Sequence, residues 1–307
     1  MKLDYTPTVS VIIPTYNRAN TIVRCIESVL AQSYSVNEII IVDDYSSDST
    51  IKQLCKFKDE ITILKTYKQI GAQAVRNMGI KAAKSDWIAF LDSDDEWLPN
   101  KIEKQVKELE KLNFESYTVI HCDCYVFRSE KNEKYVWNLP VITGRNVYTK
   151  LLQHPAPMFQ GMLTSQKALE KINYLDDRVP SFQEWDTSIR LAKYCRFIHI
   201  QEPLFIYNQH NGETISSNST NYFIGYQYVV NKHKQEIIKY CGEKTFHRHL
   251  FTNAKFAMNS GNFKNGKTVL QNIKLFSIYS MVLRICAILH IKPKYFNSFR
   301  SFVKGLA

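Results

Sequence analysis

The chain has 307 residues, of which 45% are hydrophobic, 13% aromatic and 22% charged. This composition is typical of globular proteins and excludes a disordered chain, a collagen-like repeat and a disulfide-stabilised miniprotein. The net charge is +11, but residues 226–307 hold 14 Lys and Arg against two acids, which leaves residues 1–225 at −1 and gives no reason to expect nucleic-acid binding there.

Short apolar runs alternate with helical patterns over the first hundred residues. The spacing of apolar residues predicts strands at 9–13, 38–42, 61–64 and 87–91 and helices at 19–32, 49–57 and 71–83. Strands and helices in this alternation form right-handed βαβ crossovers around a mostly parallel sheet. Ligands of such a sheet bind at the carboxyl ends of its strands, so the residues that follow the predicted strands are the first candidates for a site.

The pattern becomes mixed from about residue 116. We expect strands at 117–127 and 197–207 and a helix at 184–195, while residues 137–180, with four prolines, are expected to be irregular. After Tyr226 the pattern is helical, with turns expected at Gly261-Asn262 and near Pro293.

These patterns predict two parts of the chain. An α/β domain is expected over residues 1–225, divided at about residue 115, and a basic helical extension over 226–307. The polar stretch 211–221 is the best candidate for the boundary between them.

The sequence also indicates in which cellular compartment the chain is expected. Seven cysteines without a repeating spacing indicate a reduced, cytoplasmic chain, and the first ten residues lack the apolar core of a signal peptide. The longest apolar stretch, 275–291, is interrupted by Arg284 and His290 and is shorter than the about 20 residues that a spanning helix needs. No transmembrane segment is predicted.

Three carboxylates follow the fourth predicted strand, in Asp92-Ser93-Asp94-Asp95. Like charges at this spacing repel one another unless a cation neutralises them. Mg²⁺ and Mn²⁺ take oxygen ligands from one or two carboxylates and fill their remaining positions with diphosphate oxygens. The motif therefore indicates a metal and diphosphate site, or alternatively a solvated acidic turn before the next helix.

Two further charged positions belong to the same edge of the predicted sheet. Asp43-Asp44 follows the second strand, where carboxylates can accept hydrogen bonds from a base or a ribose; helix capping by residues 47–49 is the alternative. Arg76 lies on the helix before the Asp92 strand, where it contacts a diphosphate, steadies the carboxylates or remains an ordinary surface side chain. No GxGxxG or GxxxxGK[ST] motif is present, which disfavours a dinucleotide site and a P-loop.

A second acidic pair, Glu184 and Asp186, flanks Trp185 at a predicted helix start. Acids in the first turn are favoured by the helix dipole. A carboxylate in a partly desolvated pocket is also suited to general base catalysis, because burial raises its pKa toward the working pH. His210 follows an extended run and is either a loop side chain or a ligand.

Four segments, residues 9–18, 41–50, 76–79 and 90–97, together resemble glycosyltransferase family 2 in order and spacing over roughly the first 105 residues. The resemblance implies the GT-A fold, in which a Rossmann-like, mostly parallel sheet flanked by helices forms a nucleotide-binding part, about 1–115, and an acceptor-binding part, about 116–225.

Roles for individual residues are implied by the same resemblance. Binding of the nucleotide-sugar is implied for Pro14, Thr15, Tyr16, Arg18, Asp43, Asp44, Arg76, Asp92, Ser93 and Asp94. A metal, Mn²⁺ or Mg²⁺, is implied at Asp94, Asp95 and His210. The resemblance implies that the family's catalytic base corresponds to Glu184 or Asp186, of which we favour Glu184. The sequence departs here from the family pattern, with Gln183 where an acid is common and Glu184 where Asp is common.

The resemblance implies an inverting transferase that moves a sugar from a nucleotide-diphosphate donor, such as a UDP-sugar, to a glycan or lipid-linked acceptor in bacterial surface-polysaccharide synthesis (O-antigen, capsule or lipopolysaccharide). A metal-dependent nucleotidyltransferase and a non-catalytic sugar- or nucleic-acid-binding module are the alternatives. The extension 226–307 either packs on the core or binds an anionic membrane at the inner face of the cell membrane, through Lys292, Lys294, Arg300 and Lys304 and the apolar face of 275–291.

Overall fold

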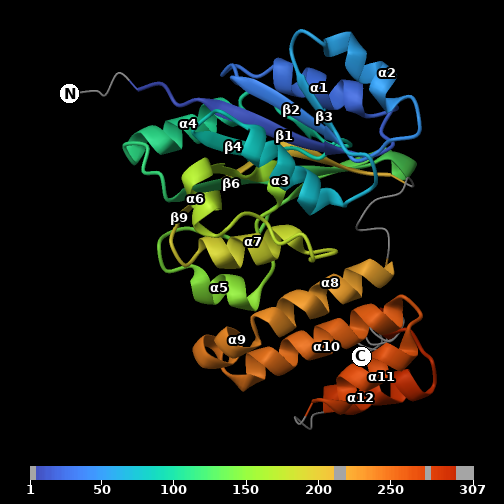
Figure 1. Cartoon of the computed structure of the whole chain (residues 1–307). Coiled ribbons are helices and arrows are strands. Elements are labelled where there is room, and N and C mark those ends of the chain that lie inside the picture. Colours follow the sequence, from blue (N-terminus) through green and yellow to red (C-terminus); the bar gives the residue numbers. More distant parts are fainter. Residues whose placement is uncertain (1–4, 211–218, 274–277, 295–307) are drawn as a thin grey trace. The chain divides into compact units, whose positions relative to one another are not determined.

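The computed structural model of the chain describes residues 5–210, 219–273 and 278–294 (Figure 1). Two compact units are present. The α/β unit comprises Met1–Arg178 and Gln183–Asn211, and the helical unit comprises Val179–Phe182 and Gly212–Ala307. The helical unit therefore begins earlier than the expected residue 226, and it also takes in four residues from within the α/β sequence.

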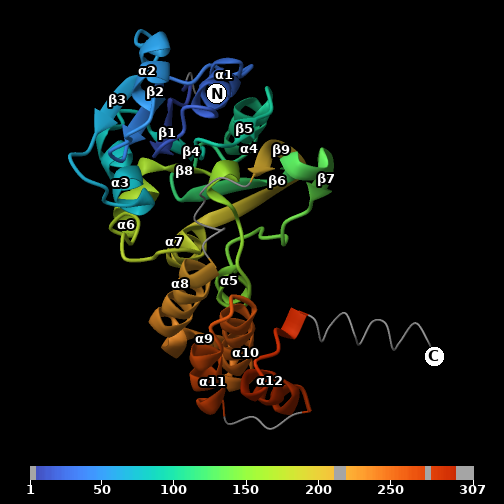
Figure 2. The same cartoon turned by 90° about the vertical axis from the view of Figure 1, so that its right-hand side faces the viewer.

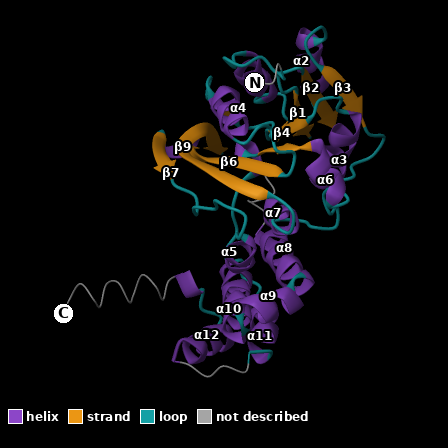
Figure 3. Ribbon diagram, turned by 90° about the vertical axis from the view of Figure 1, so that its left-hand side faces the viewer, coloured by secondary structure: helices purple, strands orange, loops and turns teal. Residues whose placement is uncertain are grey.

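A single nine-stranded sheet forms the centre of the α/β unit (Figure 3). Its strand order is β3-β2-β1-β4-β8-β6-β9-β5, with β7 paired to β6. The bounds are β1 Val9–Thr15, β2 Glu38–Asp43, β3 Thr62–Lys65, β4 Trp87–Phe90, β5 Glu96–Trp97, β6 Thr118–Arg128, β7 Glu133–Trp137, β8 Leu163–Ser165 and β9 Arg196–Gln209. Neighbours among β1 to β4 run parallel, as predicted, and β8 then pairs antiparallel with β4 and β6.

The described residues of the α/β unit form seven α-helices. They are α1 Ile22–Leu30, α2 Thr50–Leu54, α3 Ala72–Ala82, α4 Lys101–Lys111, α5 Tyr148–Gln153, α6 Gln166–Lys171 and α7 Gln183–Leu191. Helix α3 lies tight against β1, since a Cβ on Gly79 would come 2.5 Å from Cγ2 of Ile12. The predicted helices are confirmed to within a few residues at each end. The expectation of an irregular 137–180 is wrong, because α5, β8, α6 and a 3₁₀ turn at Phe159–Gly161 lie there. Each is too short, at three to six residues, to show a periodicity.

The helical unit consists of α-helices that pack against one another (Figure 2). They are α8 Ser219–Lys232, α9 Lys234–Cys241, α10 Glu243–Asn259, α11 Phe263–Gln271 and α12 Ile278–Ile288. Its core is formed by Leu250, Ala254 and Met258 of α10 with side chains of α11 and α12. The turn predicted at Gly261-Asn262 separates α10 from α11, as expected. No helix in the described part of the chain has the length and apolar character needed to cross a bilayer. Residues 275–277, Arg300 and Lys304 lie outside the described residues.

Candidate functional site

The carboxyl ends of β1, β2 and β4 meet at one edge of the sheet, because these strands are parallel neighbours. Thr15, the last residue of β1, is in register with Asp43, the last residue of β2. Pro14 is opposite Val42, one pair earlier, and Tyr16 follows, half-buried. The sheet thus places the residues expected from three separate segments along one edge.

The two acids after β2 differ in what they bind. Both carboxylate oxygens of Asp44 are engaged by protein donors. They accept hydrogen bonds from the backbone N–H groups of Ile70 and Gly71, both at 2.8 Å, and from the Thr66 hydroxyl at 3.3 Å. Asp43 accepts one bond, from Ser46 N at 3.1 Å through Oδ2. Its other oxygen, Oδ1, and the Thr15 hydroxyl are buried without a hydrogen-bond partner in the described part of the chain. Buried polar atoms are usually hydrogen-bonded, so these two call for a partner such as an ordered water or a ligand.

A turn links this pair to the end of β1. Asn17 has φ +49° and accepts hydrogen bonds at its Oδ1 from the backbone N–H groups of Ser47 at 2.8 Å and Asp48 at 3.3 Å. Asp48 in turn accepts a bond from Thr50 N at 2.9 Å at the start of α2. The N-cap residue of α2 is Ser49, whose side chain makes no capping hydrogen bond among the described residues, and Asp48, one position earlier, accepts the hydrogen bond from the first turn.

Arg76 is 3% exposed and holds the first carboxylate of the acidic motif. Its guanidinium pairs with Asp92 and donates at 3.0 Å to the side-chain oxygen of Gln183. The ring of Phe159 lies 4.8 Å from Arg76 Cζ. A buried cation fixed on one side by an aromatic ring and on the other by a carboxylate keeps its charge at the strand edge. The surface alternative for Arg76 is wrong.

Gln160 joins two of the three acids. Its Nε2 donates to Asp92 Oδ2 at 2.8 Å and to Asp95 Oδ2 at 2.7 Å, while Asp95 Oδ1 accepts from the backbone N–H of Asn208 at 2.8 Å. Burial and the negative charges of Asp94 and Asp92 raise the pKa of Asp95 well above its usual value. Both oxygens of Asp95 are thus engaged with protein donors.

Asp94 is the acid that remains open to a ligand. Its Oδ2 lies 3.2 Å from His210 Nε2 and 3.4 Å from the Arg18 guanidinium. Although burial acts to raise it, the His210 hydrogen bond and the Arg18 charge hold the pKa of Asp94 below its usual value. Ser93 is buried beside it. The structure therefore brings Asp94 and His210 together, as the sequence predicts for a metal site.

The donor set fits a hard divalent cation that takes only part of its coordination from the protein. Among the described residues no cluster of three or more acids, histidines or cysteines is arranged to hold a metal by itself. One carboxylate and one imidazole, Asp94 and His210, can nevertheless bind Mg²⁺ or Mn²⁺ when substrate phosphates supply the other oxygens. We leave Asp95 out of this site because its oxygens are already engaged.

The acids at the start of α7 lie in different surroundings. Asp186 is fully buried and paired with Arg190 Nε at 2.9 Å, and Arg190 also donates to the backbone oxygens of Ile172 and Tyr174. Glu184 is half-buried, and no ion pair or hydrogen bond from another side chain holds its carboxylate in the described part. Burial raises the pKa of Glu184 above its usual value, with Asp92 adding to this and Arg76 opposing it. Asp186 thus has an ion-pair partner in Arg190, whereas none is present for Glu184 among the described residues.

Three residues of the site were not predicted: Phe159 and Gln160 in the segment expected to be irregular, and Asn208 in β9. Asn208 donates through Nδ2 to the backbone oxygen of Asp94 at 3.0 Å, and Trp97 Nε1 donates to the backbone oxygen of Gln160 at 2.9 Å. Neutral amide side chains carry no charge pattern, and their partners lie about 65 to 114 positions away in the sequence. No local signal identifies them.

Sequence comparison shows that the chain is similar to glycosyltransferases. The profile of Glycosyl transferase family 2 matches residues 10–173, slightly more than half of the chain. An uncharacterized glycosyltransferase of Rickettsia felis is 29% identical over 298 residues, which cover 93% of this chain and 48% of the relative. WfgD of Escherichia coli, a UDP-Glc:alpha-D-GlcNAc-diphosphoundecaprenol beta-1,3-glucosyltransferase, is 38% identical over 135 residues, covering 42% of this chain and 53% of WfgD. The chain spans about half the length of these two relatives.

The fold is shared with a solved structure. Residues 1–349 of S. aureus TarS, in complex with UDP-GlcNAc, superpose with a TM-score of 0.63 at 16% identity, covering 97% of this chain and 92% of that one. The same TarS region in complex with UDP gives a TM-score of 0.61. The expected α/β architecture with additional C-terminal helices is confirmed.

Proposed function

The chain belongs to glycosyl transferase family 2, and from this premise we propose that it transfers a sugar from a nucleotide-diphosphate donor to a hydroxyl of a glycan or lipid-linked acceptor, with inversion at the anomeric carbon. The observation that carries the proposal is the half-buried Glu184 carboxylate, which has no ion-pair partner among the described residues and whose raised pKa reflects burial near the Arg76–Asp92 pair. A UDP-sugar donor is supported by the UDP-GlcNAc complex of TarS and the UDP-Glc in the name of WfgD. Metal-dependent release of UDP from a UDP-sugar in the presence of an acceptor tests it.

A single displacement accounts for the roles of the residues. Glu184 accepts the proton of the acceptor hydroxyl as that oxygen attacks the anomeric carbon from the face opposite the diphosphate. The bond between the anomeric carbon and the diphosphate oxygen breaks, and its electron pair leaves with the diphosphate. Asp94 and His210 would hold Mn²⁺ or Mg²⁺, which when bound neutralises charge on the leaving diphosphate. Arg76 keeps Asp92 in place and adds a fixed positive charge nearby.

We assign recognition of the nucleobase to Asp43 and not to Asp44. Asp43 Oδ1 and the Thr15 hydroxyl are buried, adjacent across β1 and β2 and without a hydrogen-bond partner among the described residues. Asp43 Oδ1 can accept a hydrogen bond from a base or ribose, and the Thr15 hydroxyl can donate or accept one. Asp44 has no such capacity, because its three hydrogen bonds hold the backbone at Ile70 and Gly71 before α3.

Alanine substitution of Asp43 is expected to weaken ligand binding, whereas alanine substitution of Asp44 is expected to lower stability. Asp43→Ala removes a ligand contact, which is worth about 1–2 kcal/mol, so the Kd for UDP should rise about fivefold to thirtyfold while the Tm changes little. Asp44→Ala removes the acceptor of two backbone N–H groups and should lower the Tm by several degrees. Calorimetric titration of UDP and thermal unfolding measure the two effects. An unchanged UDP affinity in Asp43→Ala would contradict the assignment.

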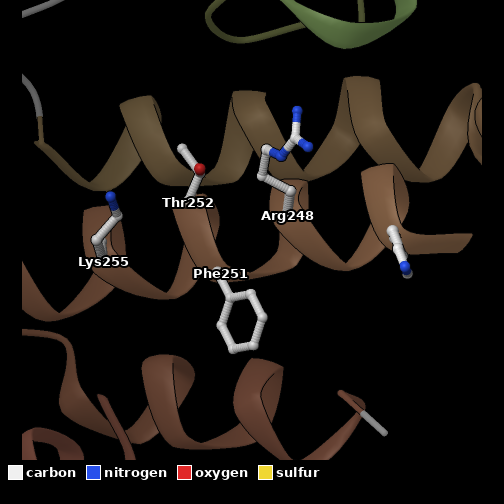
Figure 4. Close-up of a pocket in the computed structure, with 5 residues that line it drawn as sticks. Arg248, Phe251, Thr252 and Lys255 are labelled. Atoms are coloured by element: carbon white, nitrogen blue, oxygen red, sulfur yellow. The ribbon is translucent and has the colours of Figure 1, made fainter. Parts of the chain in front are cut away.

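Peripheral attachment of the helical unit to an anionic membrane is part of the proposal. Met281, Ile285, Ile288 and Leu289 are half to two-thirds exposed and recur at helical spacing along and just beyond α12. Lys292 and Lys294 follow. Helix α10 adds a pocket lined by Lys244, Arg248, Phe251, Thr252 and Lys255, in which Arg248 and Thr252 point to one side of the helix and Phe251 to the other (Figure 4). An apolar helix face combined with lysines and arginines is the composition of an interfacial helix.

Introducing a negative charge on the apolar face of α12 tests the attachment. Ile285→Glu should weaken binding to phosphatidylglycerol-containing vesicles by about tenfold or more, because burying one isoleucine is worth about 1.5–3 kcal/mol and the new acid is repelled by the lipid. Ile224→Glu is the matched control, since Ile224 is 42% exposed on α8 of the same unit. Sedimentation with vesicles measures both. Equal binding of the two variants would contradict the role of α12.

A further inference from the structure

Lys101, the first residue of α4, is a lysine inside the core of the α/β unit. Its side chain is fully buried and forms no ion pair with an acid among the described residues. Burial lowers the pKa of the Lys101 amine from its usual 10.5 to about 7, and the Cys122 thiol opposes this shift. An apolar side chain would fill the same space without losing hydration, so packing alone does not explain a lysine at this position.

Two buried side chains contact the Lys101 amine. Its Nζ donates a hydrogen bond to Gln105 Oε1 at 2.9 Å, one helical turn further along α4, and lies 3.9 Å from the centroid of the Trp97 ring. A cation over an aromatic face is attracted to it. Because a protonated amine has only donors, the oxygen of the Gln105 amide must face Lys101, and its Nε2 group must point the other way.

The 3₁₀ turn Phe159–Gly161 receives hydrogen bonds from both of these side chains. Gln105 Nε2 donates to the backbone oxygen of Gly161 at 2.8 Å, and Trp97 Nε1 donates to the backbone oxygen of Gln160 at 2.9 Å. Two consecutive carbonyl groups of the turn are thus fixed from α4 and β5. Without these donors, both buried carbonyl groups would lose hydrogen bonds and the turn could shift.

Gln160 connects this turn to the acidic motif. Its Nε2 is the donor that Asp92 and Asp95 share, at 2.8 Å and 2.7 Å. Asp94, the proposed ligand of the divalent ion, lies between these two acids in the sequence. A shift of the turn would remove the shared donor and leave the two carboxylates to repel each other beside Asp94. All of these residues belong to the α/β unit.

We propose that Lys101 is a positioning residue, whose buried amine orients Gln105 so that the turn 159–161 keeps its place. The turn holds the acids of residues 92–95 in the arrangement that binds a divalent ion together with the donor diphosphate. The proposal rests on the role given to Asp94 above. Loss of a partner that orients metal ligands typically costs about 10–100-fold in metal affinity or activity.

The test compares Lys101→Met with Lys104→Met in the full chain. Lys101→Met should weaken Mn²⁺ binding, titrated calorimetrically in the presence of UDP, by about tenfold or more and speed amide hydrogen exchange in residues 159–162. The Kd for UDP without metal should change by less than about twofold, because the contacts proposed for the base lie on β1 and β2. Lys104→Met is the matched control, since Lys104 lies on the same helix, is partly exposed and pairs with Glu202. It should leave all three measurements unchanged.

Gln105→Glu tests whether the hydrogen bond to the turn carries the effect. Glutamate keeps the shape of the side chain and an acceptor for Lys101, but its carboxylate cannot donate to the backbone oxygen of Gly161. This variant should therefore weaken Mn²⁺ binding as Lys101→Met does.

Each outcome decides for or against the positioning role. Provided that Asp94→Ala weakens Mn²⁺ binding, a folded Lys101→Met with wild-type Mn²⁺ affinity would overturn the proposal, and so would an equal loss in Lys104→Met. Should Lys101→Met fail to fold, Gln105→Glu and Trp97→Phe, which lacks the indole N–H, give the same comparison. Failure of the metal assignment is seen separately, as wild-type Mn²⁺ affinity in Asp94→Ala, and amide exchange in residues 159–162 then decides whether Lys101 positions the turn.

Discussion

Glu184→Gln is expected to lower kcat about 10²–10⁴-fold, the range that removal of a general base produces. Glutamine keeps the shape of the side chain but cannot accept the acceptor proton. No side chain of the described residues depends on the Glu184 carboxylate, so the Tm and the KM for the donor should remain close to those of the wild type. Steady-state kinetics with a saturating acceptor measures the effect.

The pH dependence of the wild type carries the same information. Burial raises the pKa of Glu184 above its usual 4.5, and the carboxylate is the active form. Activity should therefore be full above this raised pKa and fall as the pH drops through it, with the midpoint of the acidic limb above pH 4.5. Glu184→Gln should lose this limb.

Asp186→Asn is the control for Glu184→Gln. Asp186 is buried and paired with Arg190, so breaking the pair leaves a partly buried cation and should cost about 3–5 kcal/mol of stability. Its folded fraction should retain a pH profile like that of the wild type. The opposite pattern, with a stable and inactive Asp186→Asn and an active Glu184→Gln, would show that Asp186 is the base.

Asp94→Ala is expected to produce a loss of comparable size. Removal of Asp94 takes away one of the two protein ligands proposed for the divalent ion and leaves Arg18 and His210 without their shared acceptor. Loss of charge stabilisation on a leaving group typically costs about 10²–10³-fold in kcat. The dependence of activity on Mn²⁺ concentration should shift to higher concentrations or disappear.

Glu202→Ala controls for the removal of an acid. Glu202 lies on β9, more than half exposed, and pairs only with the side chain of Lys104 among the described contacts. Its loss should leave kcat and the Mn²⁺ dependence unchanged, since exposed pairs contribute little. If Asp94→Ala behaved like Glu202→Ala, the assignment of Asp94 to the diphosphate and metal would fail.

The parallel half of the sheet was predictable because its strands are nearly continuous apolar runs. Val9–Thr15 and Glu38–Asp43 are buried almost throughout, and the acids that end such runs mark the edge where ligands bind. The same logic predicted that Asp43, Asp92 and Asp94 follow strands that end at one edge of the sheet. It could not separate Asp43 from Asp44, because their difference lies in hydrogen bonds to Ile70 and Gly71, more than 25 positions away.

Other parts of the site depend on contacts that have no local pattern. Glu184 and Asp186 both suit a first helical turn, and only the pairing of Asp186 with Arg190 distinguishes them. Gln160 occupies a three-residue 3₁₀ turn, which has no periodicity to detect. Residues 179–182 belong to the helical unit through contacts with Gly225 and with aromatic rings on α8 and α10. Pro180 marks a break in the sequence pattern, but nothing local predicts which unit the segment joins.

The central claim is that the chain moves a sugar from a nucleotide diphosphate with Glu184 as base and Asp94 at the diphosphate. Nucleotide release from UDP-, GDP- and dTDP-sugars, assayed with Mn²⁺ and a diphosphate-linked lipid acceptor, tests it most directly. The account predicts release from at least one UDP-sugar, dependent on the metal and reduced at least a hundredfold in both Asp94→Ala and Glu184→Gln. An absence of turnover with every donor, together with no thermal stabilisation of the wild type by any nucleotide-sugar and tight binding to RNA, would contradict it.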